Sequence, residues 1–179
     1  MKNILIALSV LLSFSACNKT ITELPAPTDT GSNTFGAKVD DKLWSPKGFG
    51  IAPTAPILEA RYGEGRSVVI NARNFAGEPT ETEFEIYLYN VTAQGTYLLN
   101  TTTAIYPNQH ANYAYYVERK ITPVNEWITT AGYTGSVIIT KADTVNRIIA
   151  GTFSFNAINS YGTPKPIAVT EGRFDIKIP

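Results

Sequence analysis

The sequence predicts an all-β fold, either an antiparallel β-sandwich or an open β-barrel of about ten short strands. Beyond residue 33, apolar and polar side chains alternate with a period of two, which is typical of half-buried strands. No stretch of about 12 residues there has the 3.6-residue apolar period of a surface helix. The candidate strands recur at roughly 8–12-residue intervals with turn-forming residues between them, a spacing typical of sandwiches and barrels.

Three segments show the clearest alternation. In Thr82–Tyr89, every second residue is a large apolar one, and we expect Phe84, Ile86 and Leu88 to face the core. Arg147–Ala157 and residues 174–178 alternate in the same way. The other expected strands are Thr34–Val39, Ile57–Tyr62, Arg66–Arg73, Thr96–Asn100, Asn112–Arg119, Gly135–Lys141 and Pro166–Thr170.

The first 16 residues have the features of an export signal. Lys2 precedes an apolar run, Ile4–Phe14, which as a helix would rise about 16 Å, too little to cross a hydrocarbon layer of roughly 30 Å. A signal peptide over residues 1–16 therefore fits better than a membrane-spanning anchor. Residues 14–17 resemble the lipobox of bacterial lipoproteins, which implies that Cys17 is acylated and attaches the protein to a membrane. The alternative is an ordinary secretory signal followed by a free thiol.

Several motifs further along the chain resemble a known group of proteins. They are Thr34–Trp44 (TFGAKVDDKLW), Gly135–Lys141 (GSVIITK), Asp143–Asn146 (DTVN), Gly151–Phe155 (GTFSF) and Thr170–Asp175 (TEGRFD). In this order they resemble small, uncharacterised lipoprotein domains of Bacteroidetes. The resemblance implies a β-rich envelope lipoprotein and implies no particular activity. Residues 46–134 depart most from it, so we expect any ligand specificity to reside there.

Residues 17–33 are rich in Thr, Pro, Ser, Gly and Asn and offer few large apolar groups to bury. We expect them to form a flexible tether between the lipidated cysteine and a single β-domain, residues 34–179. Surface-exposed lipoproteins of Bacteroidetes usually carry an acidic stretch after the cysteine, whereas here Glu23 stands nearly alone. We therefore expect an outer-membrane lipoprotein that faces the periplasm rather than the cell exterior.

The composition excludes several functional classes. The 15 basic and 15 acidic residues cancel, which argues against nucleic-acid binding because that needs clustered positive charge. A single cysteine cannot form an internal disulfide, and a single histidine cannot build a His-based zinc site or a di-histidine metal motif. The motifs of hydrolases, metalloproteases and nucleotide-binding proteins are missing from the sequence. We therefore expect no metal, no cofactor and no catalytic residues.

Glu81, Glu83 and Glu85 share one face of their strand, about 6–7 Å apart. This spacing falls within the roughly 5–9.5 Å between the two carboxylates of a glycoside hydrolase. Acidic residues on the polar face of a strand are more often solvated or paired with Lys or Arg across the sheet, and we favour this second interpretation.

The segment Tyr106–Tyr116 interleaves aromatic rings with amide groups, a combination that suits sugar rings or peptides. It predicts a binding patch that contains Tyr106, His110, Tyr113 and Tyr116. A purely architectural alternative places Tyr113, Tyr115 and Val117 in the core and leaves Tyr116 and Glu118 outside.

The tripeptide Asp143-Thr144-Val145 lies in an expected hairpin turn and resembles the acceptor motif for O-glycosylation in Bacteroidetes, which makes Thr144 the candidate attachment point.

Three functional hypotheses follow. The first is a non-catalytic envelope lipoprotein whose domain binds a saccharide, a peptide or a protein partner. The second is a lipocalin-like carrier that encloses a small apolar ligand in a barrel, which requires an unfilled interior of several hundred Å³. The third is a glycoside hydrolase that uses Glu81, Glu83 or Glu85.

Overall fold

The computed structural model describes residues 21–48, 55–76, 80–104 and 110–179. Within these ranges the regular secondary structure is β-strand apart from one 3₁₀ turn, and no helix there is long and apolar enough to cross a membrane. The strands are β1 (Thr34–Val39), β2 (Lys42–Trp44), β3 (Leu58–Tyr62), β4 (Val68–Asn74), β5 (Glu81–Leu88), β6 (Gly95–Leu99), β7 (Tyr113–Arg119), β8 (Pro123–Ile128), β9 (Gly135–Asp143), β10 (Ile148–Asn159) and β11 (Pro166–Lys177), with a 3₁₀ turn, η1 (Glu64–Arg66), between β3 and β4.

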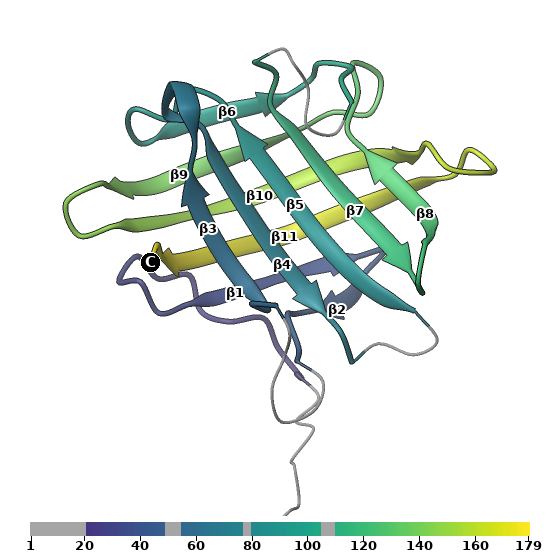
Figure 1. Cartoon of the computed structure of the whole chain (residues 1–179), viewed down its shortest axis with the longest axis horizontal. Helices are drawn as coiled ribbons and strands as arrows, with labels where there is room; N and C mark the ends of the chain where they lie inside the picture. The colour runs from purple at the N-terminus through teal and green to yellow at the C-terminus, as the bar shows by residue number, and fades with distance from the viewer. Residues whose placement is uncertain (1–20, 49–54, 77–79, 105–109) are drawn as a thin grey trace, which may run out of the picture.

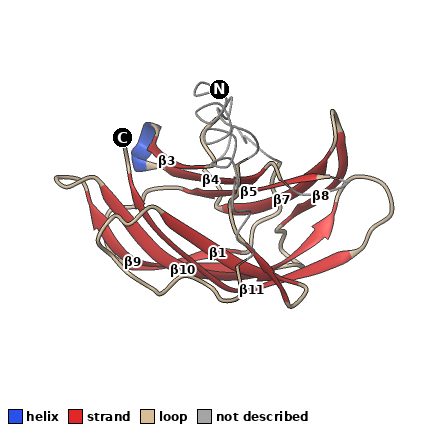
Figure 2. Cartoon of the chain, turned by 90° about the horizontal axis from the view of Figure 1, so that it is seen from below, coloured by secondary structure: helices blue, strands red, loops and turns tan. Residues whose placement is uncertain are grey.

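All eleven strands belong to one antiparallel sheet that is curled into a half-barrel (Figure 1). The order β2-β1-β11-β10-β8-β7-β5-β4-β3 runs from one edge to the other, and β9 and β6 branch from β10. Only Trp127 and Ile128 of β8 pair with β10, so the sheet bends sharply there and its two halves face each other as layers (Figure 2). The all-β antiparallel prediction is confirmed, with the connectivity of an open barrel.

Most strand positions agree with the prediction, but β2 and β8 were not predicted. Each is too short or too polar for alternation to stand out, since β2 has only three residues and β8 begins with Pro123. The two expected segments at the C-terminus form one 12-residue strand, β11. Glu171, with a φ of 52°, lies where the register with β1 and β10 shifts, so a bulge interrupts the alternation and divides one strand into two in the sequence.

Aromatic rings fill the space between the two layers. Phe84 of β5, which is fully buried as predicted, lies 5.6 Å from Phe35 of β1 and 4.7 Å from both Trp44 of β2 and Tyr116 of β7, measured between ring centroids. Because these rings come from both halves of the sheet, their packing holds the curled sheet closed. Phe153 of β10 extends the same cluster.

The architectural alternative for β7 is wrong about its faces. Tyr116 pairs with Phe84 across β5 and β7, and directly paired residues point to the same face, so Tyr116 is in the core cluster. Tyr113 pairs with Tyr87 and lies on the outer face, where it is nevertheless buried. Side chains on both faces of β7 are buried, so the alternation of the strand does not show which face is the core.

The segment before β1 packs on the domain, and we call residues 24–33 the strap. Leu24 and Pro25 lie against Gly36, so closely that a Cβ at Gly36 would meet Pro25 Cδ at 2.7 Å. Asp175 of β11 is buried, and its carboxylate accepts hydrogen bonds from Thr28, Thr30, Gly31 and Ser32. This part of the expected 17–33 tether is therefore fixed to the domain, because one buried carboxylate satisfies three consecutive backbone N–H groups.

Candidate functional site

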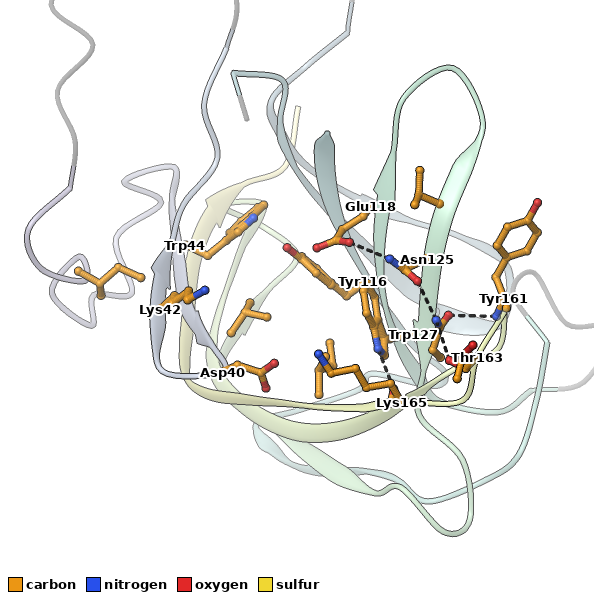
Figure 3. Close-up of a pocket in the computed structure, with 16 residues that line it drawn as sticks. Asp40, Lys42, Trp44, Tyr116, Glu118, Asn125, Trp127, Tyr161, Thr163 and Lys165 are labelled. Atoms are coloured by element: carbon orange, nitrogen blue, oxygen red, sulfur yellow. Dashed lines mark hydrogen bonds between the residues drawn. The ribbon is translucent and has the colours of Figure 1, made fainter. Parts of the chain in front are cut away.

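A groove of about 740 Å³ opens at one end of the curled sheet (Figure 3). It lies where the β1–β2 turn, the β7–β8 hairpin and the β10–β11 hairpin come together. Its lining combines aromatic, amide and charged side chains. The residues are Val39, Asp40, Lys42, Leu43, Trp44, Tyr116, Glu118, Val124, Asn125, Trp127, Asn159, Tyr161, Gly162, Thr163, Lys165 and Ile167.

Three aromatic residues form the floor of the groove, and their polar atoms are engaged within the protein. Trp44 Nε1–H donates to Thr82 Oγ1 at 2.8 Å, and Trp127 Nε1–H donates to the Lys165 carbonyl oxygen at 2.9 Å. Burial raises the pKa of Tyr116 to about 12, against the opposing effect of its hydrogen bond with Thr82. The floor therefore offers apolar ring surface rather than hydrogen-bond donors.

Exposed apolar residues gather on the rim. Tyr161 in the β10–β11 turn is 51% exposed, Val124 of β8 is 44% exposed and Leu43 of β2 is 38% exposed. All three line the groove. A tyrosine ring exposed beside an apolar floor is suited to stack on a ligand.

A chain of amide hydrogen bonds stiffens one wall. Asn125 Nδ2 donates to Glu118 Oε2 at 3.0 Å, and Asn159 Nδ2 donates to Asn125 Oδ1 at 2.8 Å. Asn159 Oδ1 in turn accepts the backbone N–H of Tyr161 at 3.0 Å (Figure 3). These contacts hold the β10–β11 turn in place against the β7–β8 hairpin, and they use the amide groups that a ligand would otherwise bind.

The four charged residues of the groove differ in how far they are engaged. Asp40 Oδ1 accepts the backbone N–H of Ala168 at 2.9 Å, and Glu118 accepts from Asn125. Lys42 and Lys165 are exposed, and among the described residues neither ammonium group has a hydrogen-bond or ion-pair partner. The groove therefore retains two cationic donors for an anionic group of a ligand.

The predicted tyrosine patch is not assembled on one surface. Tyr116 lines the groove, whereas Tyr113 points to the outer face of the sheet. The exposed His110 stacks on Tyr89, with 4.1 Å between ring centroids, and does not line the groove. Tyr106 lies outside the described residues. Adjacent positions on a strand point to opposite faces, and for this reason nearness in sequence does not make one site here.

The three glutamates of β5 lie on the outer face, as predicted, and two of them, Glu83 and Glu85, take part in structural contacts. Glu83 forms ion pairs with Arg73, at 2.9 Å, and with Arg119. Glu85 is buried and accepts hydrogen bonds from Asn71 at 2.9 Å and from the Tyr113 hydroxyl at 2.6 Å. Arginine pairing across the sheet, the interpretation favoured from the sequence, is confirmed for Glu83.

Two predicted sites remain, Cys17 and Thr144, and the structure describes the second of them. Cys17 lies outside the described residues. Thr144 is exposed in the β9–β10 turn. There Asp143 accepts hydrogen bonds from the side chain and backbone of Asn146 and from the backbone N–H of Val145, and these bonds lower the pKa of its carboxyl. In the described part of the chain, no group of three potential ligands is placed to hold a metal ion.

Sequence reasoning missed most of the groove. Trp44, Trp127 and Tyr161 come from segments separated by more than 30 residues, and only the curvature of the sheet brings them together. The signal that could have indicated them is composition, since the groove contains both tryptophans of the chain.

Comparisons with known proteins identify a family but no characterised relative. No curated protein matches the chain, and no solved structure does. Residues 32–179 match a family described as a domain of unknown function, DUF6252. The match begins within the strap and covers every strand of the sheet, and the chain therefore belongs to the DUF6252 family.

Proposed function

We propose that this protein is a bacterial envelope lipoprotein, acylated at Cys17, whose domain is a non-catalytic binding module for a saccharide, a peptide or a protein partner. The groove is the observation that carries the proposal. Its volume of about 740 Å³ falls within the roughly 300–1,000 Å³ range of small-ligand sites. Its apolar floor, exposed Tyr161 and unpaired lysines offer both stacking and polar contacts.

The location is proposed from the sequence. The lipobox-like residues 14–17 and the scarcity of acidic residues after Cys17 support an outer-membrane lipoprotein that faces the periplasm. Because Leu24 packs on the domain, at most residues 18–23 separate Cys17 from a packed residue. Six residues reach about 20 Å when fully extended, so the domain would stay close to its membrane.

The two alternative functions have less support. A carrier needs an empty interior, whereas Phe35, Phe84 and Phe153 occupy the space between the layers. A hydrolase needs carboxylates free to act on a substrate, whereas Glu83 and Glu85 are engaged by arginine, asparagine and tyrosine side chains.

Binding to glycan and peptide arrays tests the proposal. The membrane-extracted protein should bind a defined probe, and Tyr161→Ala should weaken that binding by about tenfold, because stacking interactions contribute about 1 kcal/mol or more. Leu98→Ala is the control, since Leu98 of β6 is similarly exposed, at 54%, and does not line the groove. Equal loss of binding in both variants, or in neither, would contradict a role for the groove.

Acylation is tested separately. Mass spectrometry of the protein extracted from membranes should find a mature chain that begins at Cys17 and carries acyl groups, and Cys17→Ser should release the protein from the membrane fraction. Intact mass also tests glycosylation of Thr144, which predicts a saccharide increment that Thr144→Ala abolishes.

A further inference from the structure

Among the residues that the structure describes, the backbone N–H and C=O of Leu43, at the outer edge of β2, have no hydrogen-bond partner. The register of β1 establishes this. Asp40 donates its N–H to Ala168 of β11, and because successive residues of a strand alternate in direction, the backbone groups of Val39 point to β2.

The hairpin turn between β1 and β2 independently indicates that the backbone groups of Val39 point to β2. Asp40 and Asp41 have φ values of 46° and 63°, as in a two-residue type I′ turn, whose flanking residues form a hydrogen-bonded pair. That pair is Val39 and Lys42, so the next pair, Lys38 and Leu43, is not hydrogen-bonded. Leu43 therefore directs both backbone groups away from β1.

This edge borders the groove. In the described sheet, three strands pair on one side only, and these are β2, β3 and β6. All three residues of β2 line the groove, whereas no residue of β3 or β6 does. A chain that pairs with β2 would thus lie along the groove and extend the sheet by one strand.

The chemistry of the groove favours a peptide over a sugar at this edge. Asn125 and Asn159, the amides suited to sugar hydroxyls, are bonded to each other and to neighbouring groups. Among the described residues, the groups without a partner include the backbone of Leu43, which matches a peptide backbone, and the ammonium groups of Lys42 and Lys165, which match a carboxylate.

We propose that β2 is the docking strand for an extended peptide segment with an acidic side chain, which pairs with Leu43 through its backbone and places alternate side chains in the groove. This inference rests on the proposed binding function of the groove. Pairing fixes the backbone of the bound segment, the floor takes its apolar side chains, and the lysines select the acidic one.

The first experiment selects binding decapeptides from a random phage-displayed library and measures their affinity by calorimetry. Leu43→Pro removes the outward N–H without removing a β1–β2 hydrogen bond, and it should weaken binding by about tenfold. Leu43→Ala removes the same apolar side chain but keeps the N–H, and it should therefore bind clearly more tightly than Leu43→Pro. Replacing Lys42 and Lys165 together by Gln should abolish the preference for acidic peptides.

A second measurement does not depend on the folding of the proline variant. The selected peptide is N-methylated at one residue at a time, and methylation should reduce binding most at the residue that pairs with Leu43, because Leu43 is the β2 residue whose C=O points outward. The amide proton of Leu43 should also exchange more slowly in the complex.

The outcomes separate this inference from the proposed function. Uniform tolerance of N-methylation, or equal affinity of Leu43→Pro and Leu43→Ala, would overturn strand pairing even if Tyr161→Ala weakens binding. Selection of a saccharide and no peptide would also overturn it and would leave the groove as a binding site. Peptide binding that is insensitive to Tyr161→Ala and to every substitution in β2 would contradict both strand pairing and the proposed role of the groove.

Discussion

The carboxylate of Asp175, near the end of the last strand, accepts a hydrogen bond of 2.7 Å from the backbone N–H of Gly31, which precedes the first strand. The two residues are 144 positions apart in the sequence. The same carboxylate also binds the backbone N–H groups of Thr30 and Ser32. A single buried acid thus joins the strap to β11.

Asp175→Ala should destabilise the protein by about 1–3 kcal/mol, because three partly buried backbone N–H groups lose their charged acceptor. Urea unfolding checks this value, and hydrogen exchange at Thr30, Gly31 and Ser32 should become faster. Asp29→Ala is the matched control, since Asp29 is an exposed carboxylate of the same strap. Unchanged exchange at these amides in Asp175→Ala would show that another contact holds the strap.

Acidification should weaken the same contact. Burial acts to raise the pKa of Asp175, but the hydrogen bonds from Thr28 and from the backbone of Ser32, Gly31 and Thr30 outweigh it, so the pKa lies below its usual value. A lowered pKa in the folded state contributes stability that is present above the ordinary aspartate pKa of about 3.9 and is lost as the pH falls through the folded value. The difference in unfolding free energy between the unmodified protein and Asp175→Asn should therefore shrink below about pH 4. A difference that stays constant down to pH 2 would contradict the assignment.

Tyr116 should make the protein sensitive to alkali. Its pKa of about 12 exceeds the unfolded value of 10.0, so its contribution is fully present below pH 10 and is lost as the pH rises to 12. The loss amounts to about 2–3 kcal/mol, which Tyr116→Phe should not show. Tyr161→Phe, at an exposed tyrosine, should lose stability in alkali as the unmodified protein does.

Two glycines should differ sharply in their tolerance of alanine. A Cβ at Gly135 of β9 would lie 2.3 Å from the Ser154 carbonyl oxygen and from Phe155 Cβ of the paired strand β10, whereas a Cβ at Gly95 of β6 would meet nothing within 4 Å. Gly135→Ala should therefore cost about 2 kcal/mol or more, because two paired backbones would have to separate. Gly95→Ala should be close to neutral. Thermal unfolding of both variants checks the contrast.

The sequence alone determined the fold class, because the alternation depends only on which side chains are apolar and are therefore buried. Phe84, Ile86 and Leu88 of β5 illustrate this, since all three are fully buried on the face that their spacing predicted. The same reasoning failed where both faces of a strand are buried, as at Tyr113 and Tyr116 of β7. It also failed for β2, which is too short for a pattern to emerge.

Only the tertiary structure decided where a site could form. The groove unites Trp44, Trp127 and Tyr161 because β10 bends the sheet onto itself through two residue pairs with β8, and no local pattern encodes that bend. The strap is a similar case, since its polar residues predict a loose tether until the buried carboxylate of Asp175 supplies their hydrogen bonds. The local sequence determines which side chains are apolar and become buried, whereas long-range strand pairing determines which of these side chains come into contact.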